Sequence, residues 1–161
     1  MIDTSVEKFV FDLDRTIWDT YDVRGYPIWA KQMIPPYEIV EKNKIVDDVG
    51  SYCILRQGFR EYINYLHSKD KHISFLSVGA LHGAPSDIQP SIQMLKLFGI
   101  YELFNDAKFL LYKIEEKKKH LQNLAPCVFF DDSPKHLQAV ANIENIFEIN
   151  SENIDNWSQF L

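Results

Sequence analysis

The 161-residue sequence has few cysteines and no long apolar run. Its two cysteines, Cys53 and Cys127, are too few for a disulfide framework, and neither belongs to a Cys-x-x-Cys or Cys/His cluster with zinc-ligand spacing. No apolar stretch approaches the roughly 18 to 20 residues that cross a bilayer, and the first residues lack the basic-then-apolar pattern of a signal peptide. We therefore expect a cytoplasmic protein with reduced thiols and no membrane partner.

Basic residues are also in the minority. Lys and Arg number 17 against 23 Asp and Glu, which gives a formal net charge of -6. This balance argues against a surface built mainly to hold a nucleic-acid backbone, although a local basic patch could exist within an acidic protein. The densest basic run, Lys117 to Lys119, has the pattern of a solvated helix face.

The length suits one domain with a substantial core, and we expect a single domain over residues 1–161. Hydrophobic residues make up 46% of the chain and charged residues 25%, as in ordinary globular proteins, so neither wholesale disorder nor a fibrous fold is indicated. The informative features are therefore local.

The most informative stretch runs from Phe9 to Trp18. Phe9, Val10 and Phe11 have the aromatic and β-branched character of a strand buried on both faces, and Asp12 and Asp14 follow at its end. In an open parallel sheet, ligands bind at the edge where the strands end.

The remaining chain alternates between predicted strands and helices. Residues 19–58 form an insert after the first strand, in which 39–46 and 51–55 predict a β-hairpin or flap that could cover a substrate. Strands are expected at 73–76, 107–111, 127–130 and 146–149, and helices at 58–68, 86–98, 114–124, after Ser133, and in a short C-terminal segment capped by Ser151.

This order predicts an α/β fold, a Rossmann-like three-layer α/β/α sandwich with a mainly parallel sheet and a small flap or hairpin insert. Three strands would then end at the same edge. The polar residues at their ends are Asp12 and Asp14, Ser77, and Asp131 and Asp132.

Four carboxylates at one edge would repel one another unless a cation neutralised them. Oxygen ligands with room for water and phosphate favour Mg²⁺ over Ca²⁺ or zinc. An EF-hand is excluded because the Gly and the terminal Glu of that loop are missing at the required offsets from Asp12.

These residues match a family pattern. The segment from Phe11 to Trp18 resembles the first motif of the haloacid dehalogenase superfamily, Asp-x-Asp-x-Thr after a hydrophobic strand. Ser77 resembles the second motif, Lys113 the third, and Phe129-Phe130-Asp131-Asp132 the fourth. The Trp after the first motif, the Phe-Phe-Asp-Asp sequence and the small insert are most similar to the magnesium-dependent phosphatase-1 branch.

The resemblance implies a Mg²⁺-dependent phosphatase with a defined set of roles. Asp12 would be the nucleophile that forms an aspartyl-phosphate, and Asp14 would be the general acid and base while its backbone carbonyl binds the metal. Asp131 would coordinate Mg²⁺, and Asp132 would coordinate it or orient a bound water.

The remaining roles concern the phosphate itself. Ser77, with backbone amides near Val78 and Gly79, would bind the phosphoryl oxygens. Lys113 would neutralise the phosphate, with Lys108 and the lysines at 117–119 as competing candidates.

Three alternatives remain open at this point. The phosphorylated substrate could be a small molecule, a phosphoprotein or a nucleic-acid end, and the last would make the chain a 3′- or 5′-end phosphatase. The acidic balance does not favour nucleic acid. From a different class, the chain could be a catalytically silent binding or regulatory module with the same fold.

Overall fold

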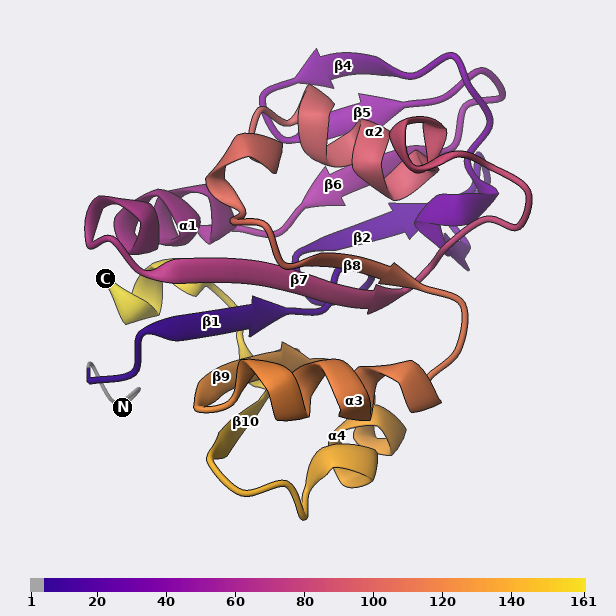
Figure 1. Cartoon of the computed structure of the whole chain (residues 1–161). Helices are drawn as coiled ribbons and strands as arrows, with labels where there is room; N and C mark the ends of the chain where they lie inside the picture. Colours follow the sequence, from indigo (N-terminus) through magenta and orange to yellow (C-terminus); the bar gives the residue numbers. More distant parts are fainter. Residues whose placement is uncertain (1–4) are drawn as a thin grey trace.

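The computed structural model describes residues 5–161 and has an α/β architecture (Figure 1). Residues 1–4 of the expected domain lie outside the described residues. In the described chain, five parallel strands form the main sheet in the order β10-β9-β1-β7-β8, an arrangement compatible with a Rossmann-like fold. These strands are β1 (Lys8–Phe11), β7 (His72–Val78), β8 (Lys108–Leu111), β9 (Cys127–Asp131) and β10 (Ile146–Asn150).

Strand β1 lies in the middle of this sheet, between β7 and β9. Phe9 is in register with Ile73 on one side and Val128 on the other. Phe9, Val10 and Phe11 are all buried, as the continuous apolar run predicts for a strand covered on both faces. Because the strands are parallel, the residues that follow β1, β7 and β9 lie at one edge of the sheet.

Helices cover both faces of the sheet (Figure 1). One apolar cluster joins Phe9 and Phe11 to α1, and a second joins Val10 to α3 and α4 on the opposite face. Alternate residues of β1 therefore point to opposite cores. The helices are α1 (Phe59–Ser68), α2 (Pro90–Leu97), α3 (Glu115–Leu124) and α4 (Pro134–Val140).

The insert forms a sheet of its own. In the described chain its five strands are antiparallel, in the order β3-β2-β6-β5-β4. They are β2 (Trp18–Tyr21), β3 (Pro27–Ile28), β4 (Glu38–Glu41), β5 (Lys44–Val46) and β6 (Tyr52–Leu55). Buried insert residues such as Ile45 and Leu55 belong to the same apolar cluster as α1 and α2, so the insert shares a core with the main sheet.

The expectation of a small flap or hairpin is therefore corrected. The hairpin of β5 and β6 is present, but residues 39–46 do not form one strand, because the chain turns at Lys42 and Asn43 between β4 and β5. Arg60 of α1 donates hydrogen bonds to Lys42 O (3.0 Å) and Asn43 Oδ1 (3.2 Å) and so holds this turn. That contact is long-range, and a local pattern cannot reveal it.

Short 3₁₀ helices complete the structure. The expected helix over 86–98 is divided into a 3₁₀ turn and α2, which begins with Pro90, and Gly99 follows with φ 72°. The 3₁₀ segments are η1 (Ala30–Gln32), η2 (Ser86–Ile88), η3 (Tyr101–Leu103), η4 (Ser151–Asn153) and η5 (Trp157–Phe160). Within residues 5–161, no helix combines the length and the apolar character needed to cross a membrane.

We predict that Trp157→Ala destabilises the protein strongly. Trp157 is fully buried, and its ring contacts those of Phe11, Phe59 and Phe130 at centroid distances of 5.7, 5.3 and 5.0 Å. Truncation would leave a cavity between β1, β9 and α1, at a cost of about 3–5 kcal/mol in unfolding free energy measured by urea denaturation. The 64% exposed Tyr26, changed to Ala, is the control and should shift it by less than about 0.5 kcal/mol. Similar losses for both variants would contradict this account of the core.

Candidate active site

A tight loop after β1 orients the two carboxylates of the first motif. The carbonyl of Leu13 accepts hydrogen bonds from the backbone N–H groups of Thr16 (3.1 Å) and Ile17 (2.9 Å), and Arg15 has a left-handed φ of 60°. The N–H of Arg15 donates to Trp18 O at 2.8 Å, which returns the chain into β2. The loop leaves Asp12 at the sheet edge and turns Asp14 toward the insert.

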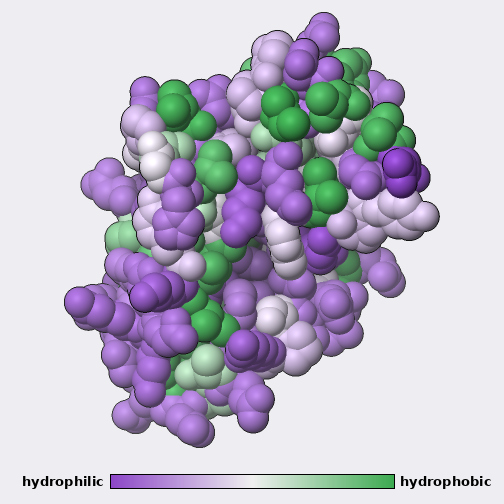
Figure 2. Space-filling model, turned by 90° about the vertical axis from the view of Figure 1, so that its right-hand side faces the viewer, coloured by the Kyte–Doolittle hydropathy of each residue, from purple (hydrophilic) through white to green (hydrophobic). Residues whose placement is uncertain are grey.

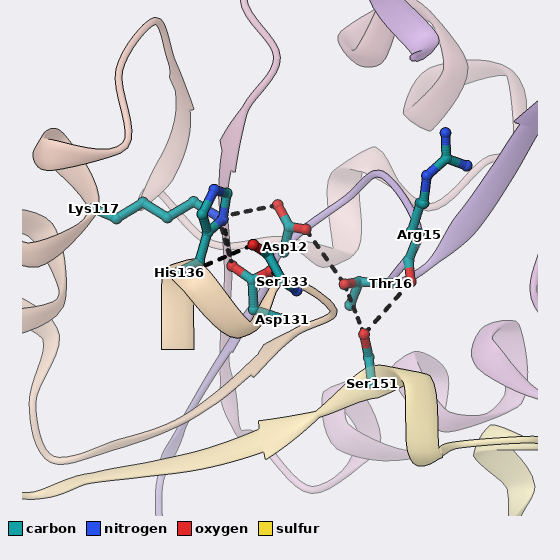
Figure 3. Close-up of polar contacts among 8 residues, drawn as sticks. All are labelled: Asp12, Arg15, Thr16, Lys117, Asp131, Ser133, His136 and Ser151. Carbon is teal, nitrogen blue, oxygen red and sulfur yellow. Dashed lines mark hydrogen bonds and ion pairs between the residues drawn. The ribbon is translucent and has the colours of Figure 1, made fainter. Parts of the chain in front are cut away.

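Asp12 is 4% exposed and is held through both carboxylate oxygens. Lys117 Nζ lies 3.2 Å from Oδ1, and the hydroxyl of Thr16 donates to Oδ2 at 3.4 Å (Figure 3). Ser151 Oγ lies 2.9 Å from Thr16 Oγ1 and donates to the carbonyl of Arg15 at 3.5 Å. Burial raises the pKa of Asp12 well above its ordinary value, against the opposing effect of the Lys117 charge.

Lys117 occupies the position that the sequence analysis gave to Lys113. Its side chain is 1% exposed, and its ammonium lies 2.6 Å from Asp131 Oδ2 and 2.8 Å from His136 Nδ1, besides Asp12. Burial alone would lower the pKa of Lys117, but the charges of Asp12 and Asp131 outweigh it and raise the pKa above its ordinary value. Lys117 is therefore a permanent cation in this site.

The expectation for Lys113 is accordingly corrected. Lys113 is exposed, precedes α3, and its side chain makes no hydrogen bond or ion pair within residues 5–161. A sequence signal for Lys117 did exist, because it lies four and seven residues before Leu121 and Leu124 and so shares their buried helix face. The surrounding charges masked that signal and indicated a solvated run.

Three carboxylates gather at the sheet edge. Oxygens of Asp12, Asp131 and Asp132 all lie within 4.8 Å of one another. Burial also raises the pKa of Asp132, with Asp131 contributing in the same direction. Burial acts to raise the pKa of Asp131 as well, but the Lys117 ammonium and the Ser133 N–H (3.0 Å) lower it overall. One ammonium faces three carboxylates, so the negative charge is only partly compensated.

This donor set fits a hard divalent cation. The ligand atoms are carboxylate oxygens, the set is compact, and the cluster opens to solvent through Asp132. The Asp14 carboxylate does not belong to it, because Asp14 Oδ1 accepts hydrogen bonds from Trp18 Nε1 (3.0 Å) and the backbone N–H of Ala30 (3.1 Å).

Asp14 lies in a different environment from Asp12. It is 6% exposed, and burial raises its pKa despite the hydrogen bonds from Trp18 and Ala30. Both donors belong to the insert, so the start of the insert fixes this side chain. Nothing in the local sequence identifies Trp18 as a hydrogen-bond donor to Asp14.

The second-motif residues, Ser77, Val78 and Gly79, have different surroundings. Ser77, 2% exposed, and Val78 line the cleft beside the carboxylates. The N–H of Gly79, however, donates to Leu111 O at 3.1 Å, which engages it in the sheet rather than with a ligand. A Cβ at Gly79 would lie 3.5 Å from Asp14 Oδ2, an ordinary van der Waals distance, so the space beside Asp14 does not by itself require glycine at this position.

The carboxylates open into a cleft of about 460 Å³. Trp29 and Lys31 of the insert and Arg15 of the loop after β1 also line this cleft, with the Arg15 guanidinium 4.8 Å from the centroid of the Trp29 ring. Figure 2 shows the face toward which β1 and β7 run, where hydrophilic residues predominate and apolar ones are more numerous in the upper half of the view. A more open hollow of about 820 Å³ lies beside the Arg56–Asp19 ion pair and contains none of the three clustered carboxylates.

Two further residues of the site escaped the sequence analysis. His136 lies in the first turn of α4 and contacts Lys117 and Asp131, and Ser151 lies after β10 and contacts Thr16. Ser151 was expected to cap the C-terminal helix, but Asn150 performs the capping there by accepting from the N–H of Glu152.

No protein-family model matches this chain, and no curated protein matches its sequence significantly.

We predict that Lys117→Met and Lys113→Met differ sharply in stability. Methionine keeps the apolar stem of lysine but removes the charge, so at position 117 it leaves Asp12 and Asp131 buried without their cation. The expected loss in unfolding free energy without divalent metal is about 3 kcal/mol, by analogy with other broken buried ion pairs. Lys113→Met should change it by less than about 0.5 kcal/mol. Equal effects in urea denaturation would contradict the assignment of the buried lysine.

Proposed function

We propose that the chain is a Mg²⁺-dependent phosphomonoesterase in which Asp12 is the nucleophile and Asp14 the general acid and base. The observation that carries the proposal is the placement of Asp12 between a buried ammonium and two further carboxylates at the open edge of a parallel sheet. The resemblance of four ordered motifs to the haloacid dehalogenase superfamily supports the same chemistry, with Lys117 in place of Lys113.

In the first step, an Asp12 oxygen attacks phosphorus and the bond to the leaving oxygen breaks. The leaving oxygen takes a proton from Asp14, whose raised pKa suits a carboxyl that must be protonated before it acts as an acid. The second step reverses the proton flow. Asp14 takes a proton from water, the water oxygen attacks the aspartyl-phosphate, and Asp12 and inorganic phosphate are released.

The cationic groups of the site make this attack possible. A carboxylate and a phosphate monoester repel each other, and the Lys117 ammonium, 3.2 Å from Asp12 Oδ1, offsets that repulsion. Asp12, Asp131 and Asp132 would hold Mg²⁺, which supplies further charge neutralisation when bound. Ser77 lines the same cleft and offers a hydroxyl to a phosphoryl oxygen. Lys31 of the insert and Arg15 of the loop after β1 add positive charge to the lining of the cleft.

We predict that Asp12→Asn abolishes phosphate release. The amide is a poor nucleophile of nearly the same size, so turnover of a panel of phosphomonoesters should fall by roughly 10³-fold or more while the fold persists. The panel should include metabolites, phosphopeptides and phosphorylated oligonucleotides, each assayed with Mg²⁺ and with EDTA. The exposed Asp48→Asn is the matched control. Activity that survives Asp12→Asn would sink the mechanism, and no activity from the unaltered chain would favour a silent binding module.

We also predict that Mg²⁺ stabilises the fold through Asp132. A ligand that binds only the native state at ten times its dissociation constant adds about 1.4 kcal/mol, visible as a higher midpoint of thermal unfolding. EDTA should reverse the shift. Asp132→Asn removes one ligand without touching Lys117 and should lose most of the shift, whereas Asp48→Asn should keep it. A shift that is identical in all three proteins would place the metal elsewhere.

A further inference from the structure

The contacts of Lys117 constrain the neighbouring histidine. An ammonium carries three hydrogens, and Lys117 Nζ lies within hydrogen-bond distance of three atoms, Asp12 Oδ1 (3.2 Å), Asp131 Oδ2 (2.6 Å) and His136 Nδ1 (2.8 Å). Figure 3 shows the imidazole beside the ammonium. Because lysine only donates, the contact with His136 is a hydrogen bond only if Nδ1 carries no proton.

His136 Nδ1 also lies 3.0 Å from Asp131 Oδ2, which raises the opposite possibility of a proton on Nδ1. That arrangement would put two N–H donors face to face at 2.8 Å beside a full positive charge. Asp131 does not need such a donor, because its oxygens already accept from Lys117 and from the Ser133 N–H. The arrangement that gives every donor an acceptor has Nδ1 accepting from Lys117, with Nδ1 and Asp131 Oδ2 as two acceptors of the same ammonium, and it leaves the single ring proton on Nε2.

The ring is positioned to use that proton. The His136 side chain is 21% exposed and lines the same cleft as Asp12, Asp132 and Ser77. Nε2 makes no hydrogen bond within the part of the chain that the structure describes. Lys117 holds the ring through Nδ1 at 2.8 Å. The backbone of His136 is fixed in the first turn of α4, where its N–H donates to Ser133 Oγ at 3.4 Å.

We propose that His136 is a phosphate-binding residue, whose Nε2–H donates a hydrogen bond to a phosphoryl oxygen in the cleft while Nδ1 accepts from Lys117. This inference rests on the proposed phosphatase function and adds to it a ligand contact that none of the four motifs contains. The orientation of this donor is fixed by the same lysine that lies beside Asp12.

Two substitutions separate the two ring nitrogens. His136→Asn keeps an acceptor near Nδ1 and removes the Nε2 donor. His136→Gln places an amide near Nε2 and removes the acceptor for Lys117. We expect His136→Asn to raise the dissociation constant for inorganic phosphate, measured calorimetrically with Mg²⁺ present, by about tenfold or more, and to act on KM more than on kcat. His136→Gln should bind phosphate within about threefold of the unaltered chain and act mainly on kcat.

The neighbouring exposed Lys135→Gln is the control and should leave phosphate binding unchanged. The proposal is overturned if His136→Asn binds inorganic phosphate as the unaltered chain does, or if the Asn and Gln variants weaken binding equally as the fold loosens. Should His136→Asn fail to fold, His136→Gln and His136→Leu are compared, and equal phosphate binding by those two overturns it. A chain that binds phosphate through His136 yet hydrolyses no monoester contradicts the proposed function alone.

Discussion

The site depends on the burial of one ammonium among three carboxylates. Taking each charge out of water costs several kcal/mol, and the attraction between Lys117 and its partners offsets that cost only in part, since two negative charges stay uncompensated. Burial raises the pKa values of Asp12 and Asp132, and the charge of Asp131 acts in the same direction. An edge with this charge pattern is costly for the metal-free fold and is well suited to a divalent cation.

The same interaction joins distant parts of the chain. Lys117 connects α3 to the ends of β1 and β9, while Thr16 and Ser151, 135 residues apart in sequence, connect the loop after β1 to the segment after β10. Asp12 is thus held from opposite sides, through Oδ1 by the lysine and through Oδ2 by the threonine. A carboxylate fixed in this way would lose little further freedom in the proposed attack on a phosphate, and nucleophilic catalysis requires such preorganisation.

Much of this arrangement could be predicted from sequence, for definite reasons. Apolar runs such as Phe9 to Phe11 predict the buried strands. Parallel pairing of these strands then brings Asp12, Ser77 and Asp131 to one edge of the sheet. The contacts that escaped prediction are tertiary. Lys117 is hidden by charged neighbours, the Gly79 amide is taken by Leu111, and the contact between Ser151 and Thr16 has no local signature. The insert was underestimated because the turn at Lys42 and Asn43 is held by Arg60 from another element.

The two first-motif carboxylates differ because they belong to different substructures. Asp12 is fixed by the main sheet and its helices, next to a cation, whereas Asp14 is fixed by Trp18 and Ala30 of the insert, with its carboxylate outside the acidic cluster. Asp12 and Asp14 are only two residues apart in sequence, so the contacts with the insert account for their different surroundings. The insert therefore does more than line the cleft, because its hydrogen bonds fix the position of the group proposed to carry the proton. Ala30, whose N–H holds Asp14, lies between Trp29 and Lys31 of the cleft lining, so a displacement of this segment would also displace Asp14 relative to Asp12.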